Sequence, residues 1–141
     1  MQVDILWPTF LLVALVYAVW LLMFVKRSGH MKANPPAKED LATGEAALRY
    51  FSPVEMPANN LRNLFEMPVL YFALVPLLLI TRHADHLQIF LAWIFVLLRV
   101  AHSVIHATRG PVMARFAVYA LSCAILSAMW IGFAIDIASG R

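Results

Sequence analysis

Four long apolar stretches, separated by shorter polar segments, dominate the hydrophobic pattern of the chain. They cover about residues 5–25, 60–80, 87–107 and 112–137. A helix needs roughly 20 apolar residues to cross a hydrocarbon core of about 30 Å, and each stretch meets that length. Helices satisfy their own backbone hydrogen bonds in lipid, whereas open strand edges do not. The pattern therefore predicts an all-α integral membrane protein, with four transmembrane helices bundled in a single domain.

Composition supports this membrane assignment. Of the 141 residues, 62% are hydrophobic and only 13% are charged, and the mean hydropathy is +0.77. Soluble domains carry about 25% charged residues, so the composition excludes an ordinary soluble domain. The first stretch follows Asp4, precedes Lys26 and lacks a small-residue cleavage site, so we interpret it as a retained helix. The net charge of +3 gives no reason to expect a nucleic-acid partner.

Positive charge is unevenly distributed among the polar segments. Residues 26–59 form a long first loop with five Lys or Arg residues, and a short helix is expected near residues 41–50. The third loop carries Arg109 and Arg115, whereas the second carries a single arginine. The positive-inside rule therefore places loops one and three in the cytoplasm and both termini on the opposite side.

Ionisable side chains gather on one face of the third predicted helix. Arg99, His102 and His106 lie within about 60° of each other, because successive helical residues are about 100° apart. A comparable polar stripe on the second predicted helix contains Asn59, Arg62, Asn63 and Glu66. A charge exposed to lipid costs at least about 2–3 kcal/mol, so the two stripes should face each other or a water-filled cavity.

Several short motifs occur in a fixed order along most of the chain. They are Lys26–Arg27, ANP at 33–35, NLFEMP at 63–68, RVAHS at 99–103 and Arg115. In order and spacing they resemble the MAPEG family, the membrane-associated proteins of eicosanoid and glutathione metabolism. The resemblance implies a homotrimer of four-helix subunits in the lipid bilayer, with glutathione bound between neighbouring subunits near the cytoplasmic side.

The resemblance also implies roles for individual residues. Arg115 is the expected catalytic residue, because a nearby guanidinium favours the thiolate of glutathione, which is the reactive nucleophile. Glutathione carries two carboxylates and one ammonium, so its site needs several cations and an acid. The predicted glutathione-binding residues are Lys26, Arg62, Asn63, Glu66, Arg99, His102 and His106. No metal site is predicted, because His102 and His106 lack a third ligand at matching spacing.

Two functions follow from these patterns. The first is a glutathione-dependent transferase, peroxidase or isomerase that acts on lipophilic small molecules. The alternative is a non-catalytic trimeric scaffold, accessory subunit or lipid-binding protein of the same fold, in which Glu66 and Arg99 only form an interhelical ion pair. Two departures from the family pattern favour the alternative: Asn59 replaces a usual arginine, and His106 replaces a frequent tyrosine.

The charge distribution gives a testable orientation. In the variants Lys38→Cys and Arg109→Cys the new thiol should react with a membrane-impermeant reagent applied to the cytoplasmic side, because positive loops are retained there. In the variant His83→Cys it should react only from the opposite side. Labelling of intact cells and of inverted vesicles measures the reactivity of each thiol from the two sides of the membrane. The reverse labelling pattern would contradict the orientation.

Overall fold

The computed structural model describes residues 2–140, and every regular element in that part of the chain is helical. Four segments are long and apolar enough to cross a membrane, which confirms the predicted four-helix fold. The first, third and fourth spans contain α1 (Leu6–Ala33), α5 (His86–Ala107) and α6 (Val112–Ser139). The second span contains α3 (Met56–Leu64) and α4 (Pro68–Ile80). The short elements are η1 (Gln2–Ile5), η2 (Glu39–Leu41), α2 (Gly44–Phe51) and η3 (Ser52–Val54).

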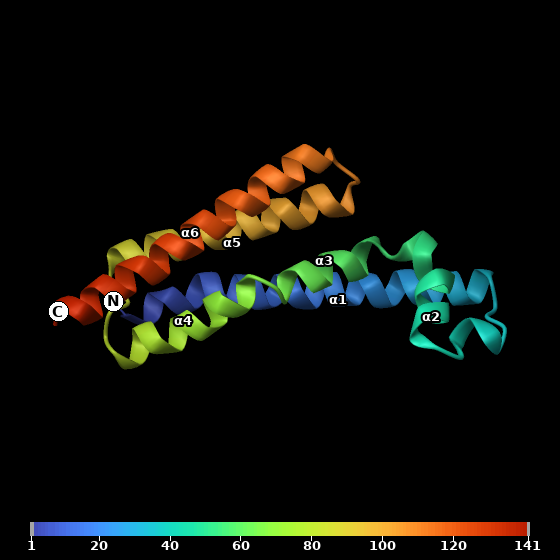
Figure 1. Cartoon of the computed structure of the whole chain (residues 1–141), viewed down its shortest axis with the longest axis horizontal. Helices are drawn as coiled ribbons and strands as arrows, with labels where there is room; N and C mark the ends of the chain where they lie inside the picture. The colour runs from blue at the N-terminus through green and yellow to red at the C-terminus, as the bar shows by residue number, and fades with distance from the viewer. Residues whose placement is uncertain (1, 141) are drawn as a thin grey trace.

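The helices form an elongated bundle (Figure 1). One long side consists of α1 with α3 and α4 alongside it, and the other consists of the antiparallel pair α5 and α6. Both chain ends lie near the turn between α4 and α5, and we call this the terminus end. Helix α2 and the turn between α5 and α6 lie toward the opposite end, which we call the loop end.

The apolar core lies between the two sides of the bundle. Tyr71 of α4 stacks on Phe95 of α5 with ring centroids 5.0 Å apart, and its hydroxyl shares a 2.9 Å hydrogen bond with Thr9 of α1. Gln88 of α5 donates from Nε2 to the carbonyl of Met129 of α6 at 3.0 Å. Large apolar side chains also cover the outer surface, because lipid solvates them there: Trp7, Phe10, Trp20, Phe90 and Ile135 are exposed.

Helix α1 is longer than its apolar stretch. We predicted a loop from residue 26, but the helix continues to Ala33, so this boundary was wrong. No proline interrupts the helix before the pair at 35–36, which ends it because a residue before proline avoids helical geometry. The charged extension is also held in place. Arg27 donates to both carboxylate oxygens of Glu55 at 2.8 and 3.0 Å, and its guanidinium lies 4.8 Å from the Phe51 ring centroid.

The second span is not the single helix that we predicted for residues 60–80. It begins at Met56, and residues 65–67 form a turn between α3 and α4. Pro68 explains the break, because it has no N–H to donate to the carbonyl of Leu64. The turn places Glu66 outside regular helix and makes the side chain of Glu66 exposed.

A tight turn joins α5 to α6. Gly110 donates to the carbonyl of Ile105 at 2.8 Å, and a Cβ at Gly110 would lie only 2.7 Å from the Ile105 side chain. A side chain at this position would force the Ile105 side chain to move, so glycine is favoured here. Arg109 before it adopts a φ of 53°, and Pro111 after it caps α6. The turn therefore fixes where α6 begins and, with it, the position of Arg115 in the next turn of helix.

Candidate functional site

The polar stripe of α5 points into the bundle near the loop end. Arg99 is 0% exposed, His102 is 3% exposed and His106 is 5% exposed. The residues between them on the outer side of α5, such as Val104, remain exposed. The helix therefore buries its ionisable side chains against α3 and α6, where lipid cannot reach them.

Arg99 joins three helices at the centre of this region. Its Nη2 donates to the backbone carbonyl of Asn63 in α3 at 3.1 Å. Its guanidinium also lies 5.4 Å from the ring centroid of Tyr119 in α6, a cation–π distance. Its Nε and Nη1 are buried and have no hydrogen-bond partner among the described residues. The side chain is thus a fully buried cation with unused donors.

Glu66 does not neutralise this cation directly. Both residues lie in the described part of the chain, and no ion pair joins them. Glu66 is exposed in the turn before α4, whereas Arg99 is fully buried. The interhelical ion pair considered from the sequence is therefore wrong for the single chain, and the Glu66 carboxylate is left accessible.

An open groove of about 380 Å³ lies beside Arg99, between the α3–α4 turn, α5 and the first two turns of α6. Its lining residues are Asn63, Glu66, His102, His106, Val112, Arg115, Phe116 and Tyr119. The groove thus brings together five of the eight residues predicted for the site, from three separate helical segments. Arg115 is half-buried there. Its guanidinium can therefore act on a bound molecule while it remains partly hydrated.

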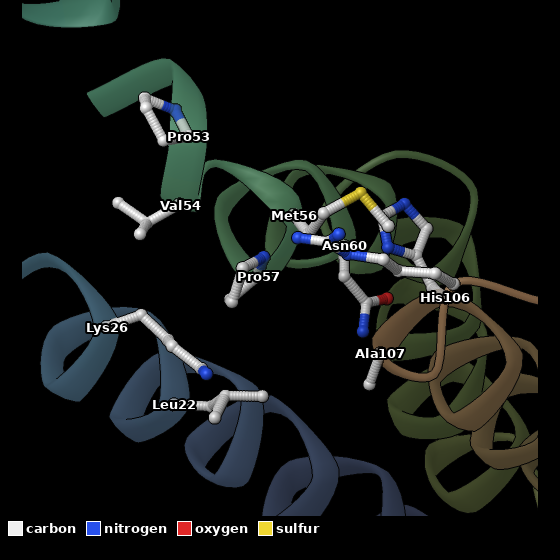
Figure 2. A pocket seen from close by; sticks show the side chains of 10 residues that line it. Leu22, Lys26, Pro53, Val54, Met56, Pro57, Asn60, His106 and Ala107 are labelled. Carbon is white, nitrogen blue, oxygen red and sulfur yellow. The ribbon is translucent and has the colours of Figure 1, made fainter. Parts of the chain in front are cut away.

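Three predicted site residues do not line the groove. Arg99 lies behind it, as described above, and Arg62 is exposed on the outer side of α3. Lys26 lies at a different cavity of about 190 Å³, together with Asn60, His106 and Arg109 (Figure 2). Among the described residues of one chain, therefore, only His106 borders both hollows, and Lys26 and Arg115 lie at separate sites.

Sequence reasoning missed Tyr119. This residue lines the groove, and its ring centroid lies 5.9 Å from that of His102. The available signal was its spacing, because Tyr119 follows Arg115 by four residues and so lies on the same face of α6. Its hydroxyl adds a neutral hydrogen-bond donor to a site in which we had expected mainly charged ones.

We predicted that Asn59 lies on the inward polar face of the second span, and this prediction was wrong. Asn59 is exposed, whereas Asn60 is 2% exposed and accepts a 3.1 Å hydrogen bond from the Ser103 hydroxyl of α5. Pro57 and Leu64 are buried with Asn60, at the spacing of one helical face. The packing of these apolar neighbours fixes the rotation of α3 and turns Asn59 and Arg62 outward.

The two histidines of α5 bring buried hydrogen-bonding atoms to this region. Their ring centroids lie 6.0 Å apart, and both Nδ1 atoms are buried without a hydrogen-bond partner in the described chain. No cluster of three or more His, Cys, Asp or Glu side chains with metal-binding geometry occurs among the described residues. The arrangement suits a polar organic ligand, because its groups are one acid, one free guanidinium, two imidazoles, an amide and a phenol.

Comparison with known proteins adds one match. Residues 5–135 match the model of the MAPEG family. Neither the comparison with curated proteins nor that with solved structures found a match. The matched range contains the second and third spans completely, most of the first and fourth, and all of the residues that line the groove.

The accessibility of Glu66 can be tested by its effect on stability. Glu66→Gln should change the free energy of unfolding by no more than about 0.5 kcal/mol, because the carboxylate is exposed and pairs with no buried cation. Thermal melting in detergent micelles measures this. Glu55→Gln is the matched comparison, and it should cost up to about 1 kcal/mol by removing the partner of Arg27. A loss of several kcal/mol for Glu66→Gln would mean that Glu66 does counter Arg99.

Proposed function

Because the chain belongs to the MAPEG family, we propose that it is a membrane-embedded, glutathione-dependent transferase, peroxidase or isomerase that acts on lipophilic electrophiles. The observation that supports this most is the groove, where Glu66, Arg115 and two buried histidines meet. Family membership and the four apolar spans make the chain an integral, multi-pass membrane protein. We further propose that the loop end, which contains the basic first loop, faces the cytoplasm.

The groove of one chain offers partners for some of the polar groups of glutathione. The exposed Glu66 carboxylate suits the ammonium group, and the imidazole rings of His102 and His106, which line the groove, can donate to a carboxylate. Arg99 serves as a positioning residue, because it holds the Asn63 backbone and the Tyr119 ring. These contacts would orient the tripeptide with its sulfur near the half-buried Arg115.

Arg115 then supplies the catalytic effect. Its cation stabilises the thiolate more than the thiol, so the thiol loses its proton to the water of the open groove at lower pH. The thiolate sulfur attacks the electrophilic atom of the second substrate and forms a new bond to it. In the same step either a leaving group departs with its bonding electrons or a π-electron pair shifts away from the attacked atom. The Tyr119 hydroxyl, on the same face of α6, can donate to negative charge that develops on the substrate.

The lipophilic substrate has a route from the bilayer. An apolar hollow of about 460 Å³ lies between α4 and α6, lined by Met67, Leu70, Leu126, Ser127, Trp130 and Ile131. Met67 follows Glu66 directly, and Leu126 lies two turns beyond Tyr119 on α6. The hollow therefore begins next to the polar groove and continues toward the middle of the membrane. An oily electrophile could reach the sulfur without passing through water.

The balance of charge supports assembly into a homotrimer. Glutathione in its thiolate form carries two carboxylates, one thiolate and one ammonium, whereas the residues that line the groove of one chain include a single Arg and a single Glu. Further cations are needed to bind two carboxylates. Arg62 is exposed on α3, where it can extend toward the groove of a neighbouring subunit. We infer that the complete site lies between subunits.

The same shortage of cations is the observation that favours the alternative function. If no neighbour completes the groove, Arg99 and its partners serve only to hold α3, α5 and α6 together, and the chain is a non-catalytic scaffold or lipid-binding protein. Calorimetry of the purified protein with reduced glutathione separates the two functions. Binding supports the enzyme, and the absence of heat and of thermal stabilisation at millimolar glutathione supports the scaffold.

The catalytic role of Arg115 predicts a specific kinetic change. Arg115→Ala should lower kcat for a model electrophile by about 10²–10³-fold, as the loss of one charge-stabilising group typically does, and should leave the melting temperature unchanged. The pKa of bound glutathione should rise toward about 8.5, so the variant should recover activity as the pH increases. Steady-state rates and thiolate absorbance across pH measure both effects.

Arg49→Ala is the control for this variant, because Arg49 is an exposed arginine of α2 that does not line the groove. It should retain full turnover at every pH. Full glutathione-dependent turnover by Arg115→Ala would rule out the proposed role of Arg115.

The trimer predicts separate effects on assembly and on binding. Native mass spectrometry in mild detergent should detect three chains per particle. Arg62→Ala should weaken glutathione binding by about 10-fold or more, since a charged hydrogen bond contributes about 1.5–3 kcal/mol, without dissociating the particle. Purely monomeric protein under these conditions would contradict the trimer, and unchanged glutathione binding by Arg62→Ala would contradict the role of Arg62.

A further inference from the structure

The second hollow at the loop end has the chemistry of an anion site. It lies between α1, α3 and the last turn of α5, where Figure 2 shows the Lys26 side chain extending from α1 into the space that faces Asn60. Lys26 and Arg109 contribute two positive charges. Among the described residues that line this cavity, none is acidic. The nearby carboxylate of Glu55 is already paired with Arg27.

Two buried neutral side chains add oriented polar atoms. The Asn60 oxygen accepts from Ser103, so the amide nitrogen of Asn60, which is 2% exposed, remains as a donor. His106 is 5% exposed, and its Nδ1 has no partner within the described chain. Buried polar atoms normally have hydrogen-bond partners. The cavity therefore combines two flexible cations near its rim with two fixed polar groups deeper inside.

The cavity lies at the depth of the lipid headgroups. The apolar stretch of α1 ends at Val25, so Lys26 is the first charged residue beyond the hydrocarbon-spanning part of this helix. Arg109 lies just beyond the end of α5, the third span. Lys and Arg at such boundaries extend toward the headgroup region. A phosphate that enters the cavity is therefore more readily supplied by the bilayer than by the aqueous phase.

An apolar groove continues from the cavity into the membrane-spanning region. It has a volume of about 170 Å³ and shares Leu22, Asn60 and Ala107 with the cavity. From there it follows α1 and α5 as far as Leu15, which is about 10 Å deeper at a helical rise of 1.5 Å per residue. Its other walls are small or apolar, so an acyl chain fits there and a polar solute does not.

We propose that these joined hollows bind one anionic phospholipid of the surrounding bilayer. Its phosphate lies near Lys26, Arg109, Asn60 and His106, and one acyl chain lies in the groove between α1 and α5. The cations select a negatively charged headgroup, and the apolar groove selects a lipid over free phosphate. This site lies on the other side of α5 from the groove that contains Arg115; His106 borders both, whereas Lys26, Arg109 and Asn60 line the cavity and not that groove, so the lipid site can be tested without glutathione.

Native mass spectrometry of the protein with an equimolar mixture of phosphatidylglycerol and phosphatidylcholine, without glutathione, tests the site. The wild type should retain phosphatidylglycerol preferentially, at one molecule per chain. Lys26→Gln and Arg109→Gln should each lower its retention by roughly fivefold, because each cation near anionic lipid contributes about that factor. Lys32→Gln is the matched control, since Lys32 is an exposed lysine of α1 that does not line the cavity, and it should behave as the wild type.

A second variant tests the acyl groove without changing any charge. Ala107→Phe should fill the groove where it meets the cavity and should lower the retention of phosphatidylglycerol, while the exposed position lets the chain fold. Equal retention of the two lipids, or unchanged retention after Lys26→Gln and Arg109→Gln together, would overturn the proposal. Stabilisation by millimolar inorganic phosphate that equals the effect of phosphatidylglycerol would also overturn it, in favour of a free-phosphate site. The proposal would also be overturned if a second copy of the chain covered the groove and no lipid were retained there.

Discussion

The polar end of this bundle depends on how one buried guanidinium is accommodated. Arg99 has no exposed surface and lies in a helix that is otherwise suited to lipid. A charge in that position is costly unless protein groups replace its solvation. The carbonyl of Asn63 in α3 and the ring of Tyr119 in α6 replace part of the solvation of the guanidinium. Arg99 thereby fixes three helices relative to one another, and its Nε and Nη1 remain buried without a hydrogen-bond partner among the described residues.

The break at Pro68 makes this arrangement possible. A continuous helix from Met56 to Ile80 would leave the carbonyl of Leu64 without an N–H partner, because Pro68 has none, and would carry Glu66 along one straight face. The turn instead exposes Glu66 beside the groove. Helix α5 then separates two polar hollows of different character. The groove on the side of α6 is lined by Glu66, Arg115 and two histidines, whereas the described residues that line the cavity on the side of α1 include cations and no acid. His106 borders both.

Much of the fold was predictable from the sequence because lipid imposes a simple rule. Each span must be a helix of about 20 apolar residues, so hydropathy alone located the four membrane segments, and the ends of α5 and α6 agree closely with the prediction. Two boundaries failed. The second span is interrupted at residues 65–67 because Pro68 has no N–H to donate, and the end of α1 lies outside the apolar rule. Lys26 to Ala33 is helical although it is polar, and it is stabilised by the distant Glu55 and Phe51. Local pattern contains no information about such partners.

The sequence by itself determined the inward face of α5, because helical spacing placed Arg99, His102 and His106 together and all three are buried. Arg115 was expected only from the resemblance of the motifs. Only the tertiary structure decided how these residues are grouped. The rotation of α3 is set by the packing of Pro57 and Leu64, which buries Asn60 and turns Asn59 and Arg62 outward. The separation of Lys26 from Arg115 follows from the position of α5 between them. Periodicity fixes directions around one helix axis, but contacts between helices depend on the packing of all of them.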